Sequence, residues 1–523
     1  MPAVSKIMSA AEAVGLIRDN DTVAVSSAGA VCYPDYVVKA LEERFLDTGH
    51  PAKLTLYAGC GHGNPVRYGG DDRFGHPGFL QRFIGSHPDV VPKMRKFIDD
   101  NEIEGYSFPQ GVINQLYRCS AAKQPGLLTK IGIGTYVDPR QDGGKLNSVT
   151  KKDLVSLVTV DGEDYLFYRS VPINAAIFRA TSSDESGNIS IEEEALRLEN
   201  LEMALAVKAA NGKVIVQVKR IVADGCIKSR DVAVPSELVD AVVVCEEPEI
   251  YHAQTAGTVY SPFLSGELRA PASAAAVAKD HLEAVDIVCR RAVYELFPGA
   301  IVNIGKGIGD GVGVAAAVEG FSDKVTFTLE LGSFGGTPQS RADFSTTMNA
   351  TAYISHPSMF DFYHAGGLDI AFLGAAQIDA EGNVNVSRYG DHAAGQGGFI
   401  DISQTAKKVV FCTYFRAKGL RAHAQDRKLS IDAEGGIPKF VDRVEQITFN
   451  GKLAREKGQE VVICTERAVF RLVPDGVMLT EIAPGVDLQK DILDRMGFRP
   501  LISGDLRSMD PRVFTPGRMG AFD

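Results

Sequence analysis

Short runs of β-branched and other apolar residues recur along the chain and predict the strands of its sheets. The clearest of them lie at residues 22–27, 53–59, 213–219, 300–305, 324–330 and 407–414. Stretches with helical spacing separate these runs: after Pro34 an apolar stripe follows at Val38, Leu41 and Phe45, and a wider apolar face covers residues 285–296. This alternation predicts βαβ units, and therefore an α/β fold whose sheets are largely parallel and covered by helices on both faces.

An acidic segment at residues 191–205 predicts one further helix. Leu198, Leu201 and Leu205 share one helical face, and the glutamates of IEEEALRLENLEMAL surround them. This pattern is typical of a helix that packs an apolar stripe and exposes an acidic face. We therefore expect no functional site in this segment.

One stretch of sequence occurs twice. ATSSDESGNIS precedes AANGKVIVQV in the first half of the chain, and GAAQIDAEGNVNVS precedes TAKKVVFCTY in the second. The pairs Gly187-Asn188 and Gly382-Asn383 have the same offset as Lys213 and Lys408. Self-similarity of this kind predicts two related domains in tandem, and duplicated folds commonly bind their ligand at the interface.

The remaining correspondence between the halves is looser and predicts an insertion in the first half, at about residues 60–147. Residues 251–280 are rich in Pro, Ala, Ser and Gly, as is typical of a linker or crossing segment. We therefore expect a first half at 1–250, a linker at 251–280 and a second half at 281–523.

Composition and charge exclude several classes of protein. The formal net charge of the 523 residues is −11 with both signs interspersed, so no basic surface for nucleic acid or anionic lipid is expected. The 8 cysteines form no CxxC pair, which favours reduced thiols over a disulfide framework or a zinc site. No apolar run approaches the roughly 20 residues of a membrane span, and the N-terminus lacks the apolar stretch of a signal peptide. These features predict a soluble, cytoplasmic protein.

The two copies differ most clearly where one strand ends. KLTLYAGCG ends in Ala58-Gly59, whereas KVTFTLELGSFGG ends in Glu330 followed by glycines. Open α/β sheets bind ligands at the carboxyl ends of their strands. A carboxylate there could attack a carbonyl carbon while glycine N–H groups stabilise the oxyanion. From spacing alone, a salt-bridged surface glutamate beside a turn is an equally good interpretation.

Two glycine-rich segments are less specific. In GKGIGDGVG at residues 305–313, Asp310 and Val312 occupy the places where a dinucleotide-binding motif needs its third glycine, so hydride transfer is disfavoured. In GDHAAGQGGFIDIS, Gly395, Gly397 and Gly398 predict either a loop pressed against a ligand or a flexible turn.

Three histidines lie in the predicted insertion, at His62, His76 and His87, near Asp71 and Asp72. Their spacing matches no helix-based metal-ligand motif. We therefore expect no metal site.

Several segments together resemble the family I coenzyme A transferases, in particular the fused bacterial acetate and propionate CoA-transferases. They are GGKLN, SFPQGVINQLYR, DIVCRRAVYEL, VNIGKGIGDGV, TLELGSFGGTP, GGLDIAFLGAAQIDAEGNVNVS and GQGGFIDIS, and they span nearly the whole chain. The resemblance implies an enzyme that moves CoA between a short-chain acyl-CoA and a small carboxylic acid. It implies CoA as a substrate, with no permanently bound cofactor, and a homodimer or homotetramer.

The resemblance also implies roles for individual residues. Glu330 would be the nucleophile that carries acyl and CoA groups in turn, and the amide of Gly397 or Gly398 would help to form an oxyanion hole. Gln110 would reach into the same cleft, and Asn349 is a weaker candidate for a polar contact there.

Departures from the family pattern leave the substrate open. IGSHPDVVP replaces a segment that usually carries HWG, and the chain has no tryptophan. Gly305 and Gly307 are weak candidates for CoA binding, and Arg416 and Lys418 could bind CoA phosphates or lie on the surface. An acyl-CoA hydrolase on the same fold, or a non-catalytic sensor of acyl-CoA or sugar phosphates, are the alternatives.

Overall fold

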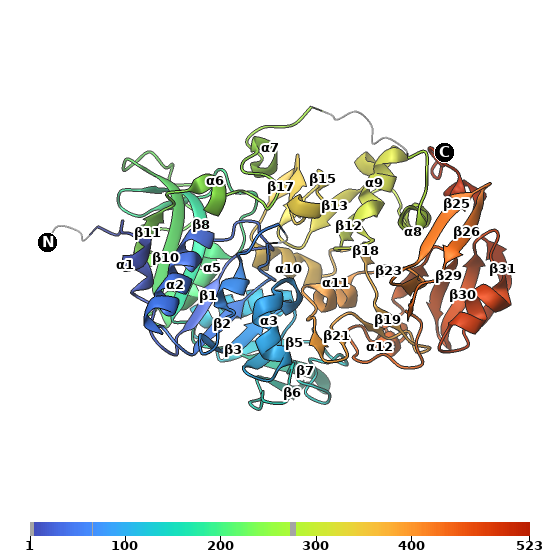
Figure 1. Ribbon diagram of the computed structural model, residues 1–523, viewed down its shortest axis with the longest axis horizontal. Coiled ribbons are helices and arrows are strands. Elements are labelled where there is room, and N and C mark those ends of the chain that lie inside the picture. The colour runs from blue at the N-terminus through green and yellow to red at the C-terminus, as the bar shows by residue number, and fades with distance from the viewer. Residues whose placement is uncertain (1–4, 65, 272–278) are drawn as a thin grey trace.

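Two large sheets, one from each half of the chain, organise the computed structural model, which describes residues 5–64, 66–271 and 279–523 (Figure 1). The first half lies at the left of the view in blue to green, and the second at the right in yellow to red. This is the α/β architecture of two tandem, related units that the sequence predicts. None of the described helices combines the length and the apolar character that crossing a membrane requires.

The first sheet is a parallel sheet with strands from the whole first half. Its order is β11 (Ala241–Val244), β10 (Lys213–Val222), β8 (Ala175–Asp184), β1 (Thr22–Val25), β2 (Leu54–Ala58), β3 (Leu80–Gly85) and β4 (Glu104–Ser107). Each neighbouring pair in this order is parallel, and β9 (Ile189–Ser190) adds to β8 in the antiparallel sense. The predicted insertion at 60–147 supplies β3 and β4 and so extends this sheet at one edge.

The second sheet has a parallel centre and antiparallel edges. Its order is β17 (Ala352–Tyr353), β14 (Ser333–Phe334), β13 (Thr326–Leu329), β12 (Ile301–Ile304), β18 (Ile370–Leu373), β23 (Lys408–Cys412), β28 (Glu460–Cys464), β29 (Ala468–Val473), β30 (Gly476–Ile482) and β31 (Leu501–Ser508). The strands from β13 to β28 pair in parallel, β14 and β29 begin antiparallel extensions, and the edge strand β31 pairs in parallel with β30. All six strands predicted from the sequence are present in the two sheets.

Helices and small sheets complete the fold. The helices are α1 (Ala10–Val14), α2 (Asp35–Thr48), α3 (Pro92–Asp99), α4 (Gln110–Ala121), α5 (Asn200–Ala209), α6 (Pro248–Tyr251), α7 (Pro262–Ser265), α8 (Ala284–Val293), α9 (Asp310–Val318), α10 (His356–His364), α11 (Phe399–Thr405) and α12 (Gly451–Glu456). The small sheets comprise β5 (Gly126–Thr129) with β6 (Val155–Val160) and β7 (Glu163–Arg169), and the strand pairs β15 (Thr337–Pro338) with β16 (Thr347–Met348), β19 (Gln377–Ile378) with β20 (Val384–Asn385), β21 (Arg388–Tyr389) with β22 (His392–Ala393), β24 (Arg416–Ala417) with β27 (Ile437–Pro438), and β25 (Arg421–Gln425) with β26 (Lys428–Ala433). The predicted helices after Pro34 and across 285–296 correspond to α2 and α8.

The sequence repeat is a repeat of structure. The order β10-β8-β1-β2 in the first sheet matches the order β23-β18-β12-β13 in the second. The same turn also occurs twice: the amides of Asn188 bond to the carboxylate of Asp184, and those of Asn383 bond to the carboxylate of Asp379. A local hydrogen-bonded turn of this kind specifies its own shape, which explains why its residues are so alike in the two copies.

Each sheet buries side chains on both of its faces. In β1, Val23 and Val25 belong to one apolar cluster and Ala24 to another. In the second sheet, Val302 of β12 and Val409 of β23 likewise belong to clusters on different faces. Because successive strand residues point to opposite faces, this burial requires helices on both sides, as a parallel sheet normally has.

The prediction of an acidic helix at residues 191–205 is wrong. The helix α5 begins only at Asn200, and Leu201 and Leu205 are 39% and 40% exposed. The acidic residues Glu194 and Glu199 are buried instead, because each meets a cationic or imidazole partner from a distant part of the chain. Helical periodicity could not reveal these long-range partners.

Gly332 forms the turn after β13, and we expect its substitution by alanine to destabilise the protein. A Cβ at Gly332 would lie 2.1 Å from the carbonyl oxygen of Ile354 at a φ of +112°. Gly307 is a matched control, because its φ is +113° but a Cβ there would meet nothing within 4 Å. We expect Gly307→Ala to cost about 1–2 kcal/mol through backbone strain. Gly332→Ala should cost about 1–3 kcal/mol more, since the backbone must shift.

Thermal and urea unfolding of the full chain measure this difference. Equal unfolding midpoints for the two variants would show that the approach of Ile354 to Gly332 does not constrain the fold.

Candidate active site

A cavity of about 370 Å³ lies where the carboxyl ends of strands from both sheets meet. From the first half, its lining includes residues that follow β1, β2, β3 and β4, namely Gly29, Cys60, His87 and Gln110. From the second half, it includes residues that follow β12, β13 and β18, namely Gly305, Glu330 and Gly374. Both halves are therefore needed to form the cavity, and its position is the one that open α/β sheets use for ligands.

Glu330 follows the last residue of β13 and lines this cavity with a half-buried side chain. Burial raises the pKa of its carboxyl group above the ordinary glutamate value, and the charge of Asp401 adds to that effect. Its own backbone amide, the charge of His356 and the carboxamide of Asn303 act in the opposite direction and favour the carboxylate. Glu330 has no salt-bridge partner among the described residues. A desolvated, unpaired carboxylate is well suited to nucleophilic attack.

A buried hydrogen-bond network joins β12, β13 and α10 close to Glu330. The carboxamide Nδ2 of Asn303 donates to the hydroxyl oxygen of Tyr363 at 3.2 Å, and that hydroxyl lies 2.9 Å from Oγ1 of Thr328. Asn303, Thr328 and Tyr363 are all buried, at no more than 1% exposure. Buried and mutually bonded side chains of this kind hold one geometry, so the strand that carries Glu330 is rigidly placed.

The loop Gly395–Gly398 joins the two halves at the cavity. The N–H of Gly397 donates to the carbonyl oxygen of Ser86 at 3.0 Å, and the N–H of Gln110 donates to the carbonyl oxygen of Gly397 at 3.1 Å. Gly397 has a φ of +59°. A Cβ at Gly395 would lie 2.6 Å from Cδ of Pro88. The glycines are therefore required by close contact between the halves and by backbone conformation.

The two glycines predicted for the oxyanion hole differ in what their amides do. The N–H of Gly397 is already bonded to Ser86. The N–H of Gly398 has no hydrogen-bond acceptor among the described residues, and Gly398 lines the cavity. Of the two, only the amide of Gly398 is available to a bound oxyanion.

Gln110 lies at the start of α4 and lines the same cavity, as expected from the sequence. Its side chain is 1% exposed and its Nε2 lies 2.8 Å from Nε2 of His356. The other end of its carboxamide is close to the loop, because a Cβ at Gly397 would lie 3.5 Å from Oε1 of Gln110. The structure thus brings Gln110, Glu330, Gly397 and Gly398 together, along with Gly305.

Further titratable groups line the cavity that were not predicted from the sequence as catalytic or CoA-binding residues, among them Cys60, His87 and Lys439. Burial raises the pKa of the Cys60 thiol to about 12, with the charges of Glu330 and Glu199 adding to the effect. Burial lowers the pKa of His87 to about 4 and lowers that of Lys439. Cys60 and His87 are therefore neutral at pH 7. Each of these residues follows the end of a strand. This position is the only feature of the sequence from which their place in the cavity could have been predicted.

Asn349 does not line the cavity, contrary to its predicted role as a substrate contact. Its Oδ1 accepts from the N–H of Ala270 at 2.8 Å and its Nδ2 donates to the carbonyl oxygen of Ala270 at 3.1 Å. Both ends of the carboxamide are therefore used to hold residues of the predicted linker 251–280. Residues 272–278 of that linker lie outside the described part of the chain.

Of the residues predicted as weak CoA contacts, only Gly305 lines this cavity, and the other three have contacts elsewhere. Gly307 does not line the cavity, and its N–H donates to Oδ1 of Asp310 at 3.2 Å. Nε of Arg416 donates to the carbonyl oxygen of Gly435 at 2.8 Å. Lys418 lines a different cavity of about 310 Å³. None of these three residues lines the cavity that contains Glu330.

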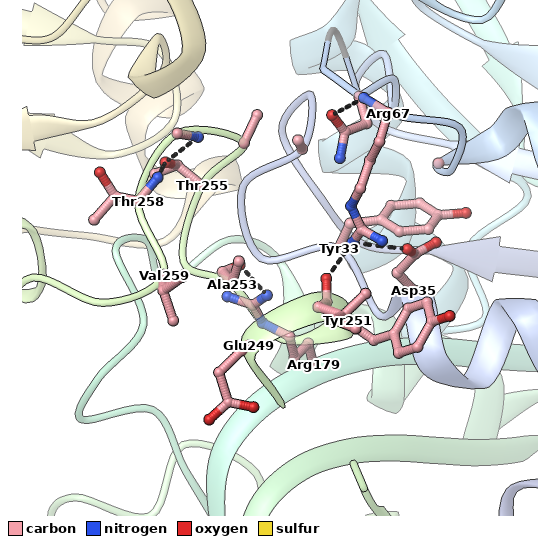
Figure 2. A pocket seen from close by; sticks show the side chains of 16 residues that line it. Tyr33, Asp35, Arg67, Arg179, Glu249, Tyr251, Ala253, Thr255, Thr258 and Val259 are labelled. Carbon is pink, nitrogen blue, oxygen red and sulfur yellow. Dashed lines mark hydrogen bonds and ion pairs between the residues drawn. The ribbon is translucent and has the colours of Figure 1, made fainter. Parts of the chain in front are cut away.

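A cavity of about 280 Å³ in the first half is shown in Figure 2. Its two arginines already have partners: Arg67 lies 3.1 Å from the carboxylate of Asp35, and Arg179 donates to the carbonyl oxygen of Ala253 at 2.7 Å. These contacts fasten the segment after α6 to the first sheet. We assign no ligand to this cavity.

Two of the three histidines in the predicted insertion lie beside carboxylates. His62 lies 3.0 Å from the carboxylate of Asp71, and His76 lies 2.7 Å from that of Glu42. Across residues 5–64, 66–271 and 279–523, no three His, Cys, Asp or Glu side chains are grouped so that they could hold a metal ion.

Comparisons with known proteins agree with this geometry. The profile of the family described as "Coenzyme A transferase" matches residues 7–245. A caffeate CoA-transferase of Acetobacterium woodii is 43% identical over 517 residues, which is 98% of this chain and 98% of the relative. The acetate CoA-transferase YdiF of Escherichia coli K12 is 40% identical over 516 residues, which is 98% of this chain and 96% of the relative.

Solved structures extend the likeness to the fold. The apoenzyme of the acyl-CoA transferase YdiF from Escherichia coli O157:H7 superimposes with a TM-score of 0.93 at 39% identity, over 99% of this chain and 98% of that one. A thioester complex of the same enzyme with CoA superimposes with a TM-score of 0.91 at 40% identity, over 99% of this chain and 97% of that one. Identity and fold are thus shared over nearly the whole length, and the chain belongs to the coenzyme A transferase family.

Proposed function

We propose that the protein transfers coenzyme A between a short-chain acyl-CoA and a small carboxylic acid, with Glu330 carrying CoA as a thioester. The observation that carries this proposal is the unpaired carboxylate of Glu330 in a cavity built from both halves. The relatives named for acetate and caffeate CoA transfer, and the related enzyme captured as a thioester with CoA, support the same chemistry.

The proposed reaction has two half-reactions that mirror each other. The Glu330 carboxylate attacks the thioester carbonyl carbon of acyl-CoA, and the C–S bond breaks to give an acyl-glutamyl anhydride and CoA thiolate. The thiolate then attacks the glutamyl carbonyl carbon, which releases the donor acid as a carboxylate and leaves a glutamyl-CoA thioester. The acceptor carboxylate reverses these steps, so atoms and charge balance and no base has to remove a proton.

The cavity supplies what this chemistry needs. Each attack places negative charge on a carbonyl oxygen, and the proposed donor to that oxygen is the N–H of Gly398, which has no acceptor among the described residues. Cys60 and His87 bring no charge that would compete, because both are neutral at pH 7. A carboxylate is a weak nucleophile towards a thioester, so binding energy from the rest of CoA must lower the barrier.

The choice of acid follows from the apolar part of the lining. Val386, Phe399 and Ile402 line the cavity together with Tyr389. Apolar walls accept the hydrocarbon part of a small acid while the reacting carboxylate faces Glu330. We propose a small carboxylic acid with a hydrocarbon side as the acceptor.

The proposed division of the chain into halves at 1–250 and 281–523 has support from the two sheets. Strands from β1 to β11 form the first sheet and strands from β12 onward form the second. A duplicated frame of this kind would allow the halves to close on CoA at their interface.

The covalent step predicts a specific adduct. Incubation with acetyl-CoA should add the mass of CoA to the intact protein, and peptide mapping should place it on Glu330. Glu330→Ala should abolish both the adduct and transfer to an added acid. Glu330→Asp should lower kcat by ~100-fold or more, because moving the carboxylate by one methylene breaks the attack geometry.

Glu456→Asp is the control, since Glu456 is an exposed residue of α12. It should retain full activity and leave the adduct in place. Full transfer by Glu330→Ala would overturn the proposal, and release of free CoA without an added acid would indicate a hydrolase.

The raised pKa of Glu330 predicts a conflict between activity and stability. A buried acid with a raised pKa favours the folded state in its protonated form and costs stability once it is ionised. Glu330→Gln should therefore unfold at a higher temperature than the unmodified protein at pH 7 while losing transfer activity. The difference should shrink as the pH falls below the usual glutamate pKa of about 4.3, where the native side chain is also neutral.

Thermal unfolding at several pH values measures this effect. A Glu330→Gln variant that is less stable than the unmodified protein at pH 7 would show that the carboxylate has a stabilising partner.

A further inference from the structure

The linker between the two halves is fastened to one hairpin of the second half, the β15–β16 hairpin at residues 337–349. Within this hairpin, Oδ1 of Asp343 accepts a hydrogen bond from the hydroxyl group of Thr258 at 3.0 Å. Directly after β16, the carboxamide of Asn349 bonds to both backbone groups of Ala270, at 2.8 and 3.1 Å. The linker therefore holds the hairpin at two separate points.

The helix α7 of the linker docks on the same hairpin. The hydroxyl group of Tyr353 lies 2.8 Å from the carbonyl oxygen of Leu264 and 3.1 Å from that of Thr347. In Figure 1, α7 accordingly lies beside β17 at the top of the view. The side chain of Leu264 is 3% exposed and belongs to the same apolar cluster as Leu331, the residue that follows Glu330. The linker is therefore packed against the second half close to the nucleophile.

The β15–β16 hairpin also forms part of the wall of the active cavity. Phe344 and Ser345, which directly follow Asp343, line the cavity together with Glu330 and Leu331. The ring of Phe344 is apolar and half-buried, and Ser345 is 7% exposed. The residue that the linker holds and the residues that line the cavity are thus neighbours in the chain.

The backbone of this hairpin is strained. Arg341, Ser345 and Asn349 have φ values of +58°, +82° and +60°, although none of them is glycine. A left-handed backbone at such residues persists only where the surrounding structure imposes it. The hydrogen bonds that the linker makes to Asp343 and Asn349 supply this restraint. Without them, we expect the hairpin to relax away from its position in the cavity wall.

A CoA adduct on Glu330 is open to a competing reaction with water. Water that attacks the glutamyl carbonyl carbon breaks the C–S bond, releases CoA as the free thiol, restores the carboxylate and gives one proton to the solvent. This reaction wastes the thioester, because no new acyl-CoA is formed. An enzyme that transfers CoA therefore needs a wall that keeps water away from the adduct.

We infer that Phe344 protects the glutamyl-CoA adduct from water, and that Asp343 and Asn349 are positioning residues through which the linker keeps Phe344 in the cavity wall. The inference rests on the proposed CoA transfer and adds how the site selects an acid over water. The apolar ring of Phe344 offers water no hydrogen-bond partner beside the adduct, whereas an acceptor acid is bound by the rest of the cavity.

The lifetime of the adduct tests the role of Phe344. The full chain is loaded with acetyl-CoA, separated from small molecules, and followed by intact-protein mass in buffer without any added acid. Phe344→Ala should shorten the lifetime of the adduct by about tenfold, because water then reaches the glutamyl carbonyl carbon. Phe344→Leu keeps an apolar side chain and should hold the lifetime within about threefold of the unmodified protein.

Variants of the two positioning contacts should have the same effect. Asn349→Gly removes both bonds to Ala270 and adds no strain, because glycine adopts a φ of +60° freely. Thr258→Val keeps the shape of the side chain and removes the hydroxyl group that Asp343 accepts from. Both variants should lose the adduct faster and release more free CoA for each CoA transferred to an added acid.

Arg427→Gly is the matched control for Asn349→Gly. Arg427 has a φ of +61°, is exposed in the turn between β25 and β26, and does not line the cavity. A glycine there has the same backbone conformation but no contact with the linker. The lifetime of the adduct should therefore be unchanged.

A double variant tests whether the linker acts through Phe344. If it does, Asn349→Gly combined with Phe344→Ala should lose the adduct no faster than Phe344→Ala alone, because the side chain that Asn349 positions is already gone. Additive acceleration of the loss would overturn the positioning role.

Other outcomes also separate the proposals. Loss of the adduct from Phe344→Ala at the unmodified rate would overturn the inference, even if the adduct formed more slowly, since slower formation alone would indicate a merely structural role. Should Asn349→Gly fail to fold, Thr258→Val and Phe344→Ala still decide the matter. Absence of any adduct on Glu330 in the unmodified protein would instead contradict the proposed function.

Discussion

The hydrogen bonds that join Ser86, Gln110 and Gly397 connect the two halves of the chain, and the geometry around Glu330 depends on them. Glu330 stands at a strand end of the second sheet, whereas Gln110 belongs to the first half. The docking of the loop Gly395–Gly398, together with the contacts between α4 and α10, brings the two into one cavity. Its glycines permit that docking, since a side chain at Gly395 would collide with the first half. A loop that is bonded on both sides also restrains how far the halves can move without opening the cavity.

Glu330 differs from the buried glutamates Glu194 and Glu199 in how its carboxylate is compensated. Glu194 is held by the guanidinium of Arg179 at 2.7 Å, and Glu199 is held by His356. Glu330 has only weaker compensation from a backbone amide, a carboxamide and a charge at a distance. Because an ion pair would stabilise the carboxylate and reduce its reactivity, the lack of a salt-bridge partner for Glu330 among the described residues agrees with the nucleophilic role that we propose for it. The stability lost there must come from packing elsewhere, as in the two faces of each sheet.

The duplicated frame and the single nucleophile are complementary features. Equivalent strands occupy equivalent positions in the two sheets, and the Asp-Gly-Asn turn repeats with the same hydrogen bonds. At the end of β2, however, the first copy has Ala58-Gly59 and then Cys60, where the second copy has Glu330 after β13. One copy thus supplies the carboxylate, and the other supplies Gln110 and a neutral wall. Because the two copies differ at this edge of the sheet, the two sides of the cavity carry different chemical groups.

The sequence by itself determined the strands, the two helices with clear apolar stripes, the repeat, and Glu330 as the distinctive acid at a strand end. These features are local: side-chain alternation, helical spacing and turn hydrogen bonds act between residues that are near one another in the chain. Only the tertiary structure decided that Glu199 is buried against His356, that Asn349 holds Ala270, and that Gly398 rather than Gly397 has a free amide. Each of those outcomes depends on which distant backbone or side chain arrives beside the residue, because a polar group bonds to whatever the packed fold places within reach.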